Sequence, residues 1–433
     1  MPLAADSFPG GIHMSLNKSL FAALLAAGTA ASPLAFATNG YFAHGYGVKS
    51  LGMAGVGYAL PQDGLAAATN PAGTALVGNR LDLGVTYFRP DRSVNVHDAG
   101  APGANGHYDG NDTQAFLIPE FGYTRQLNDQ IGIGLAVYGN GGMNTDYGRS
   151  PFAAYGSHGS AGVDLTQIFV TPSLAWRITE RQTVGIGINY AYQIFEARGI
   201  DGFAQMSESP NHVSNKGHDN SSGWGLRLGW SGQITDSLTL GAAWSSKIKT
   251  GRFDSYDGLF ADQGSFDIPE NYGVGLAWRA TDRLTLAADV QEIKYSDVRS
   301  ISNSVNQLFS GHPLGSDDGP NFGWEDIRVY KLGASYAVTP QLTVRGGFSW
   351  ADQALDKNET FFNTLAPGVV RKHLTLGATW AQQSGNEISV FYAHAFTEEL
   401  KGNPNSVPAA FGGGAVDLKM KQDCFGIAYS WKL

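Results

Sequence analysis

The sequence predicts an all-β protein: a 14-stranded antiparallel transmembrane β-barrel with an N-terminal plug, or hatch, inside its lumen. Three observations support this fold class. Apolar residues alternate with small or polar ones along many segments, short and long connections follow each other in turn, and tryptophan recurs near the same end of successive segments. Only 15% of the 433 residues are charged, whereas about 25% is usual in soluble domains.

The composition argues against several other classes of protein. The formal net charge is −9 and no basic run occurs, so a nucleic-acid partner is not expected. The single cysteine cannot form a disulfide within the chain. Aromatic residues are plentiful and charged ones sparse, which excludes disorder as the main state.

Residues 1–37 predict a leader followed by a secretory signal peptide, with Met14 as the natural start. Lys18 supplies the positive charge, residues 20–31 form an apolar stretch, and Ala35-Phe36-Ala37 matches a cleavage signal. The alternative is a buried N-terminal helix. We predict cleavage after Ala37, and beyond that residue no apolar run reaches the ~18 residues of a membrane helix.

Fourteen segments show the period-two alternation of β-strands. They are 80–89, 114–127, 131–139, 164–178, 183–198, 222–234, 238–250, 268–280, 284–297, 325–338, 342–351, 369–381, 386–396 and 417–433. Tight connections alternate strictly with long loops, as an up-and-down barrel with both termini on one side requires. Closure is expected because lipid offers no hydrogen-bond partner to an open sheet edge.

The two parities of each segment predict which face meets lipid. In 222–234 one parity carries Leu226, Leu228 and Trp230, and the other carries small or polar residues. Apolar side chains are therefore expected outside and polar ones inside. A girdle at the periplasmic interface is predicted for Trp176, Trp230, Trp278, Tyr336, Trp380 and Trp431, and an outer girdle for Trp244 and Trp350. The alternative is a soluble β-sandwich core.

Residues 38–79 interrupt this pattern. They are rich in glycine and small residues and show no strand alternation, although 48–54 and 64–69 could be helical. We predict that this segment is the hatch and that 80–433 is the barrel, whose lumen is wide enough to hold a plug. The alternative is a disordered periplasmic tail, but Leu51, Met53 and Val56 favour burial.

The segment Gly45–Gly73, with Gln62-Asp63-Gly64 and Asn70-Pro71-Ala72, resembles the hatch of the FadL-type long-chain fatty-acid transporter family of outer-membrane proteins. That family also includes aromatic-hydrocarbon uptake channels. The resemblance covers the predicted mature chain, although the chain ends in Leu433 where such barrels usually end in an aromatic residue.

The resemblance implies a location in the bacterial outer membrane and a plugged barrel. Hydrophobic substrate would enter from a groove facing the outer leaflet, move to a lumen pocket and leave sideways through a gap made by a kinked third strand. Gly132, Gly134 and the 139–142 cluster make that strand pliable. We also expect Asn70, Pro71 and Ala72 to set a tight hatch conformation and to take part in gating.

Candidate ligand-binding residues come from the inward parity. One or two of Arg227, Lys331 and Arg345 are predicted to meet a fatty-acid carboxylate through charge-assisted hydrogen bonds. The alternative is that inward cations pair with inward acids such as Asp82 and Asp289, and a neutral hydrocarbon would need no cation. The inward aromatics expected to line an apolar pocket or to pack against the hatch are Phe88, Phe116, Phe169, Phe195 and Phe391.

The outer loops carry apolar patches at 151–155, 308–309 and 361–362. Exposed apolar groups are costly unless they are used, so the patches favour an entrance for hydrophobic solutes. The alternative is that they pack against the mouth of the barrel.

We therefore predict a passive outer-membrane channel for long-chain fatty acids or related lipophilic molecules. The alternatives are an aromatic-hydrocarbon channel of the same family and an adhesin or structural barrel that acts through its loops. No catalytic motif occurs, so an enzyme is not expected, and neither is a cofactor or a metal. The expected partners are hydrophobic small molecules, outer-membrane lipids and the barrel assembly machinery, with the chain itself a monomer.

Overall fold

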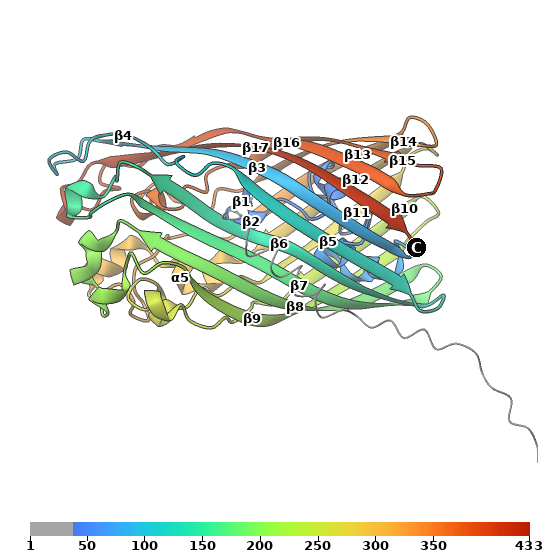
Figure 1. Ribbon diagram of the computed structural model, residues 1–433, viewed down its shortest axis with the longest axis horizontal. Helices are drawn as coiled ribbons and strands as arrows, with labels where there is room; N and C mark the ends of the chain where they lie inside the picture. Colours follow the sequence, from blue (N-terminus) through green and yellow to red (C-terminus); the bar gives the residue numbers. More distant parts are fainter. Residues whose placement is uncertain (1–37) are drawn as a thin grey trace, which may run out of the picture. The chain divides into compact units, whose positions relative to one another are not determined.

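A single sheet runs around the described part of the chain and closes on itself (Figure 1). This computed structural model describes residues 38–433, and the predicted leader and signal peptide lie outside them. No helix among the described residues is both long and apolar enough to span a membrane.

The sheet contains 17 strands. They are β1 (Thr38–Asn39), β2 (Phe42–Ala43), β3 (Arg80–His97), β4 (Gly106–Asp109), β5 (Phe116–Gln126), β6 (Ile131–Tyr147), β7 (Ala161–Thr179), β8 (Gln182–Arg198), β9 (Asp219–Gln233), β10 (Leu238–Ser245), β11 (Asn271–Arg279), β12 (Leu284–Ile293), β13 (Ile327–Ala337), β14 (Leu342–Ala351), β15 (Lys372–Ala381), β16 (Glu387–Leu400) and β17 (Ala415–Lys432). Without the short β1, β2 and β4, fourteen strands form the wall. Their neighbours pair antiparallel, and β17 closes on β3 from Lys432↔Arg80 to Ala415↔His97. The predicted fourteen-stranded antiparallel barrel is confirmed.

The helical elements are short. The α-helices are α2 (Val48–Leu51), α3 (Ala66–Thr69), α4 (Ala261–Gly264) and α5 (Arg299–Ser302). The 3-10 helices are η1 (Pro71–Ala75), η2 (Ala153–Tyr155), η3 (Asp201–Met206), η4 (Pro210–His212), η5 (Asp254–Tyr256), η6 (Tyr295–Asp297), η7 (Val305–Ser310), η8 (Phe362–Thr364) and η9 (Ala409–Phe411). Helices α2 and α3 fall within the two stretches that the sequence indicated as helical.

β3 and β6 extend furthest beyond their predicted ends. β3 continues to His97 and β6 to Tyr147, whereas the predicted segments end at 89 and 139. In β3 the inward parity continues through Val94 and Val96, which are buried. The predicted loop 90–113 is therefore strand for its first part, and its inward side chains belong to the lumen.

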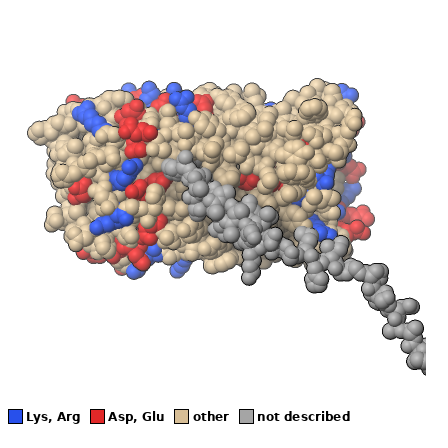
Figure 2. All heavy atoms as spheres, in the orientation of Figure 1, with Lys and Arg blue, Asp and Glu red and all other residues tan. Residues whose placement is uncertain are grey.

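The faces of the wall follow the predicted parity. In β11, Val274 and Trp278 are exposed while Gly273 and Ala277 are buried. Trp380, in the predicted girdle, is 59% exposed. Figure 2 shows charged side chains mostly toward the two ends of the visible face, with a broad uncharged zone between them. Apolar outside and polar inside is the arrangement of a barrel that meets lipid.

Residues 38–79, the hatch segment, contact inward-facing side chains from most of the wall. These are Glu120 (β5), Arg177 (β7), Arg227 (β9), Asp289 (β12), Lys331 (β13), Arg345 (β14), Thr375 (β15) and Glu387 (β16). The segment therefore lies inside the ring of strands, where Figure 1 shows it in blue.

Inward glycines let the hatch backbone approach the wall closely. A Cβ added at Gly347 would lie 2.5 Å from the Ala54 nitrogen, and one at Gly241 would lie 1.9 Å from the Tyr58 carbonyl oxygen. Real Cβ atoms do not come this close to backbone. Each such position must be glycine for the hatch to keep its place.

The adjacent glycines of β14 test this fit. Gly347→Ala should destabilise the folded protein by about 1–3 kcal/mol, because the hatch must shift to admit the methyl group. Gly346→Ala is the matched control: its Cβ would meet Leu376 and Thr375 at an ordinary 3.7 Å. Thermal unfolding of the detergent-solubilised protein, followed by circular dichroism, measures both, and equal melting temperatures would contradict the proposed fit.

Candidate functional site

The three predicted ligand cations all contact the hatch segment. Lys331 Nζ donates to the carbonyls of His44 at 3.0 Å and Gly55 at 3.3 Å. Arg345 Nε donates to Gln62 Oε1 at 3.1 Å. These cations supply donors to backbone and amide oxygens of the hatch, and buried polar groups need such partners.

Arg227 acts in the same way on the end of α3. Its Nη1 donates to the carbonyl of Ala68 and, at 3.1 Å, to that of Thr69. The last carbonyls of a helix have no partner within the helix, and Arg227 provides one from β9. A carboxylate-binding role for Arg227, Lys331 and Arg345 stays a prediction.

Inward acids also bind the hatch. Asp289 Oδ2 accepts from the Gly57 nitrogen at 2.7 Å and the Tyr58 nitrogen at 3.2 Å. Glu120 accepts from the Gly47 and Val48 nitrogens at 3.2 Å and 3.1 Å. The predicted cations form no ion pair with these acids among residues 38–433. Lys331, Arg227 and both acids bind the hatch backbone, and Arg345 binds the side chains of Gln62 and Thr379.

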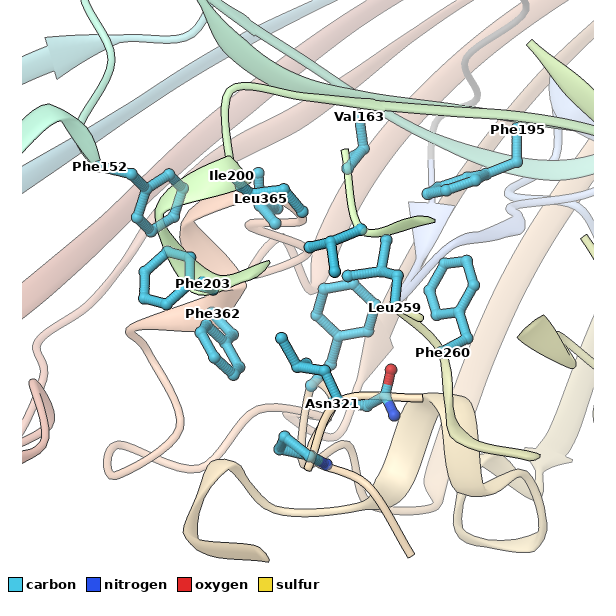
Figure 3. A pocket seen from close by; sticks show the side chains of 14 residues that line it. Phe152, Val163, Phe195, Ile200, Phe203, Leu259, Phe260, Asn321, Phe362 and Leu365 are labelled. Carbon is cyan, nitrogen blue, oxygen red and sulfur yellow. The ribbon is translucent and has the colours of Figure 1, made fainter. Parts of the chain in front are cut away.

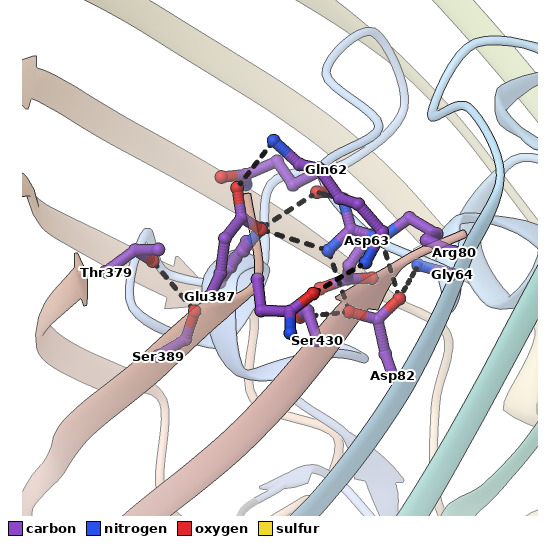
Figure 4. A network of polar contacts seen from close by, with 12 residues as sticks. Gln62, Asp63, Gly64, Arg80, Asp82, Thr379, Glu387, Ser389 and Ser430 are labelled. Carbon is purple, nitrogen blue, oxygen red and sulfur yellow. Dashed lines mark hydrogen bonds and ion pairs between the residues drawn. The ribbon is translucent and has the colours of Figure 1, made fainter. Parts of the chain in front are cut away.

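A polar network fixes the Gln62-Asp63-Gly64 turn to the wall (Figure 4). Lys49 Nζ lies 2.5 Å from Glu387 Oε2, and Arg80 lies 3.2 Å from the same carboxylate oxygen. Arg80 also pairs with Asp82 at 2.7 Å, and Asp82 accepts from the Gly64 nitrogen at 2.8 Å. Removing one member would leave a buried charge without its partner, which is strongly destabilising.

The Asn70-Pro71-Ala72 motif lies against β8 and β9. Asn70 Nδ2 donates to the carbonyls of Tyr58 at 2.7 Å and Trp230 at 2.9 Å, while its Oδ1 accepts from the Ala72 nitrogen at 3.1 Å. Pro71 begins η1, where its missing N–H costs nothing. The motif thus joins two parts of the hatch to the wall, and its gating role stays a prediction.

The third wall strand, β6, is kinked at the predicted glycine cluster. Its register against β7 shifts between Gly139 and Gly141, which leaves Asn140 as an extra residue. Burial alternates up to Tyr138 and is continuous from there to Thr145. A bulge of this kind bends a strand, and here it turns the outer half of β6 inward.

The kink removes part of the wall's hydrogen-bond ladder. β5 and β6 pair only up to Phe121↔Val137. Beyond that point β6 pairs with the hatch instead, with Phe42 opposite Gly141 and the Gly142 nitrogen donating to the Tyr41 carbonyl at 3.0 Å. We give the name wall gap to 116–120 of β5 and 138–143 of β6, the stretches of these neighbouring strands that do not pair with each other.

A lumen pocket adjoins the wall gap. Its lining residues are Ala43, His44, Gly45, Tyr46, Leu51, Thr86, Ile118, Glu120, Tyr138, Gly139, Phe391, Ala393 and Cys424. Three predicted aromatics, Phe88, Phe116 and Phe391, share one apolar cluster beside it. Phe169 lies close by, with its ring 5.6 Å from that of Tyr138.

Phe195 belongs to a different cavity, the outer pocket, among the loops (Figure 3). It is lined by Phe152, Val163, Phe195, Ile200, Phe203, Val213, Leu259, Phe260, Leu314, Pro320, Asn321, Phe322, Phe362 and Leu365. Asn321 is the only polar side chain in this set. The rings of Phe152 and Phe361 meet edge to face at 5.8 Å, so two of the loop patches predicted from the sequence pack together. Phe152 and Phe362 of these patches also line the cavity.

Glu359 joins two of the loops around the outer pocket. Its carboxylate accepts from Ser304 Oγ at 2.5 Å and from the Val305 nitrogen at 2.9 Å. Burial raises the pKa of Glu359 above its usual range, and the hydrogen bonds from Ser304 and Val305 oppose that rise.

A third cavity, the middle pocket, shares no lining residue with the other two, but Ala366 follows Leu365 of the outer pocket in sequence. It is lined by Gly40, Phe88, Pro90, Arg92, Gly142, Met143, Asn144, Trp324, Ala366, Pro367, Gly368 and Met420. Arg92 is absent from the residues predicted to bind ligand, because 90–113 is predicted to be a loop. The signal was present, since Arg92 has the same parity as Phe88 and Val94.

No group of histidine, cysteine, aspartate or glutamate side chains within residues 38–433 is arranged to hold a metal ion. The three pockets are lined mainly by apolar side chains with a few hydrogen-bonding groups, a lining that suits apolar solutes.

Comparison with known proteins was made on the sequence and on the fold. Residues 28–432 match the family described as outer membrane protein transport protein (OMPP1/FadL/TodX). Outer membrane protein P1 of Haemophilus influenzae is 23% identical, with 87% of this chain and 89% of the relative covered. The long-chain fatty acid transport protein of Escherichia coli K12 is 21% identical, with 83% and 90% covered.

Two solved structures share the fold. A Pseudomonas aeruginosa FadL homologue has a TM-score of 0.69 at 19% identity, covering 91% of this chain and 99% of its own. The Pseudomonas putida toluene transporter TodX has a TM-score of 0.66 at 18% identity, covering 90% and 99%.

Asn70→Ala tests how firmly the hatch is held. The change removes the donor that Asn70 supplies to the Tyr58 and Trp230 carbonyls, which should cost about 1–3 kcal/mol and loosen the hatch. The readout is maleimide labelling of Ala68→Cys, a buried hatch position, in a chain whose one native cysteine is also buried. Labelling should be faster in the Asn70→Ala background than in the Ala68→Cys parent. Equal rates would argue against Asn70 as an anchor.

Proposed function

We propose that this chain, which belongs to the OMPP1/FadL/TodX family of outer membrane transport proteins, releases its substrates sideways through the wall gap. The chain is a bacterial outer membrane protein and a channel for the uptake of hydrophobic compounds. The proposal concerns the route, the substrate and the part played by the hatch.

The single observation that carries the route is the missing ladder between β5 and β6. Ile118 and Glu120 on one side of the wall gap and Tyr138 and Gly139 on the other line the same lumen pocket. An apolar solute in that pocket lies next to a stretch of the wall where the neighbouring strands β5 and β6 do not pair. Lateral release lets such a solute reach lipid without crossing water, where its exposure would be unfavourable.

The hatch segment supports a plug role. Residues 38–79 fill the lumen with contacts on most wall strands, so a straight aqueous path is blocked while the β6 kink provides another exit. We propose that residues 38–79 act as the plug and 80–433 as the barrel. Passage is then diffusion down a gradient, and the chain needs neither catalysis nor a cofactor. We further propose that it acts as a monomer, is inserted by the barrel assembly machinery and contacts outer-membrane lipids.

The substrate class we propose first is long-chain fatty acids, which a curated relative is named for transporting. A second candidate is neutral aromatic hydrocarbons, because the outer pocket is lined by phenylalanine rings and contains no cation. Edge-to-face aromatic contacts would suit such a solute.

Straightening β6 tests the route. Deleting Asn140 removes the extra residue, so that the strand can continue its ladder along β5. Uptake of long-chain fatty acid or toluene by a transporter-null strain that carries the variant should then fall at least about tenfold, because the proposed exit through the wall is closed. The control is Asn140→Ala, which removes the hydrogen bonds to Tyr46 and Gln167 but keeps the residue count. Equal uptake by the deletion variant and the parent would rule out the wall gap as the exit.

A further inference from the structure

Arg92 is a buried cation whose role is not explained by the hatch. It lies on β3, is 1% exposed, and is the one charged residue among the largest fully buried side chains of residues 38–433. It lines the middle pocket. Arginine is almost never fully buried unless it is paired, so its partners are informative.

All hydrogen-bond acceptors around this guanidinium are neutral. Nη1 donates to the Asn144 carbonyl at 2.5 Å and to Asn144 Oδ1 at 3.1 Å. Nη2 donates to the Thr113 carbonyl at 2.6 Å, and Nε donates to Asn111 Oδ1 at 3.3 Å. Each terminal nitrogen carries two hydrogens, so Nη2 retains one for a further acceptor.

The nearby carboxylates are engaged elsewhere. Asp91 pairs with Lys421 at 3.2 Å, and Asp146 pairs with Arg198 at 3.2 Å. Asp109 accepts from the side-chain nitrogen of Asn111. No carboxylate within the described residues forms an ion pair with Arg92, so its charge is only partly offset at a distance.

The walls around Arg92 suit an amphiphile. Phe88, Met143, Trp324 and Met420 supply apolar surface to the middle pocket, and thioether side chains adapt readily to a flexible chain. Apart from Arg92, no lysine or arginine lines any of the three pockets described above. Lys331, Arg345 and the Nη1 of Arg227 donate to the hatch, and none of these three residues lines one of the three pockets.

We infer that the middle pocket is the carboxylate-binding site of the channel, with Arg92 as the residue that binds the head group of a long-chain fatty acid. The inference rests on the proposed function, since it names the anionic member of the proposed substrates. The carboxylate takes the free Nη2 hydrogen and displaces Asn144 Oδ1, the longer of the two contacts at Nη1. The acyl chain then lies against the apolar walls, and neutral solutes pass the same point without this contact.

The test compares a charged and an uncharged substrate of equal chain length in a transporter-null strain. Arg92→Gln should lower oleate uptake at least about tenfold, the effect of losing a charge-assisted hydrogen bond, and should leave oleyl alcohol uptake within about twofold. Arg92→Lys keeps the charge but loses the planar guanidinium. Its oleate uptake should lie between that of the parent and that of Arg92→Gln. Arg89→Gln is the matched control, because Arg89 lies on the outward parity of the same strand and contacts Gln114.

The outcomes separate a ligand-binding role of Arg92 from a structural one. If uptake of oleate and of oleyl alcohol declines together in Arg92→Gln, or if oleate uptake is unchanged, Arg92 only supports the fold and the inference is wrong. If the parent protein takes up oleyl alcohol but not oleate, the inference fails while the channel function stands; uptake of neither defeats the channel function for these substrates. A crystal structure of the parent protein with oleate is an independent check, because it does not depend on whether a variant folds. The head group must lie within hydrogen-bond distance of Arg92.

Discussion

The need to pair every backbone polar group in a low-dielectric surrounding governs this structure. In lipid an open sheet edge would leave N–H and C=O groups without partners, and the pairing of β17 with β3 removes both edges. The missing ladder between β5 and β6 is compensated from inside. The hatch strand β2 and the Tyr41 carbonyl provide partners at Gly141 and Gly142. The wall gap and the hatch therefore depend on each other, since the outer half of β6 turns inward and pairs with the hatch strand β2.

The same constraint explains the charges of the lumen. A hatch made of short helices and turns exposes many carbonyls and amides that no regular element pairs. Lys331 and Arg227 donate to hatch carbonyls, whereas Asp289 and Glu120 accept from hatch nitrogens. Inward charges on the wall thus replace the water that a wider channel would admit. This arrangement leaves Arg92 distinct, because the acceptors that surround it belong to the wall and to the loop before β5.

Close packing and polar satisfaction act together at the hatch. Where the wall binds the hatch backbone through hydrogen bonds, it carries a charged or amide side chain. Where the hatch backbone packs directly against a strand, the wall carries glycine. Gly229 and Arg227 show this on one strand, since the first makes room for Asn70 and the second caps α3. A uniformly polar lumen could not produce such a fit. The high glycine content of the chain therefore has a specific origin in the contact between plug and wall.

Periodicity alone determined the number of strands, their antiparallel order and the face that each side chain takes, because these follow from a period of two and from the alternation of short and long connections. The aromatic residues Phe88, Phe116 and Phe391 were placed inward on the same ground. Tertiary structure decided the rest. The contacts of Lys331 and Arg345 with the hatch depend on where a non-repeating segment lies, which no period encodes. The kink of β6 and the extension of β3 to Arg92 depend on pairing between strands that are distant in the sequence. A local pattern of residues does not show where two neighbouring strands stop pairing.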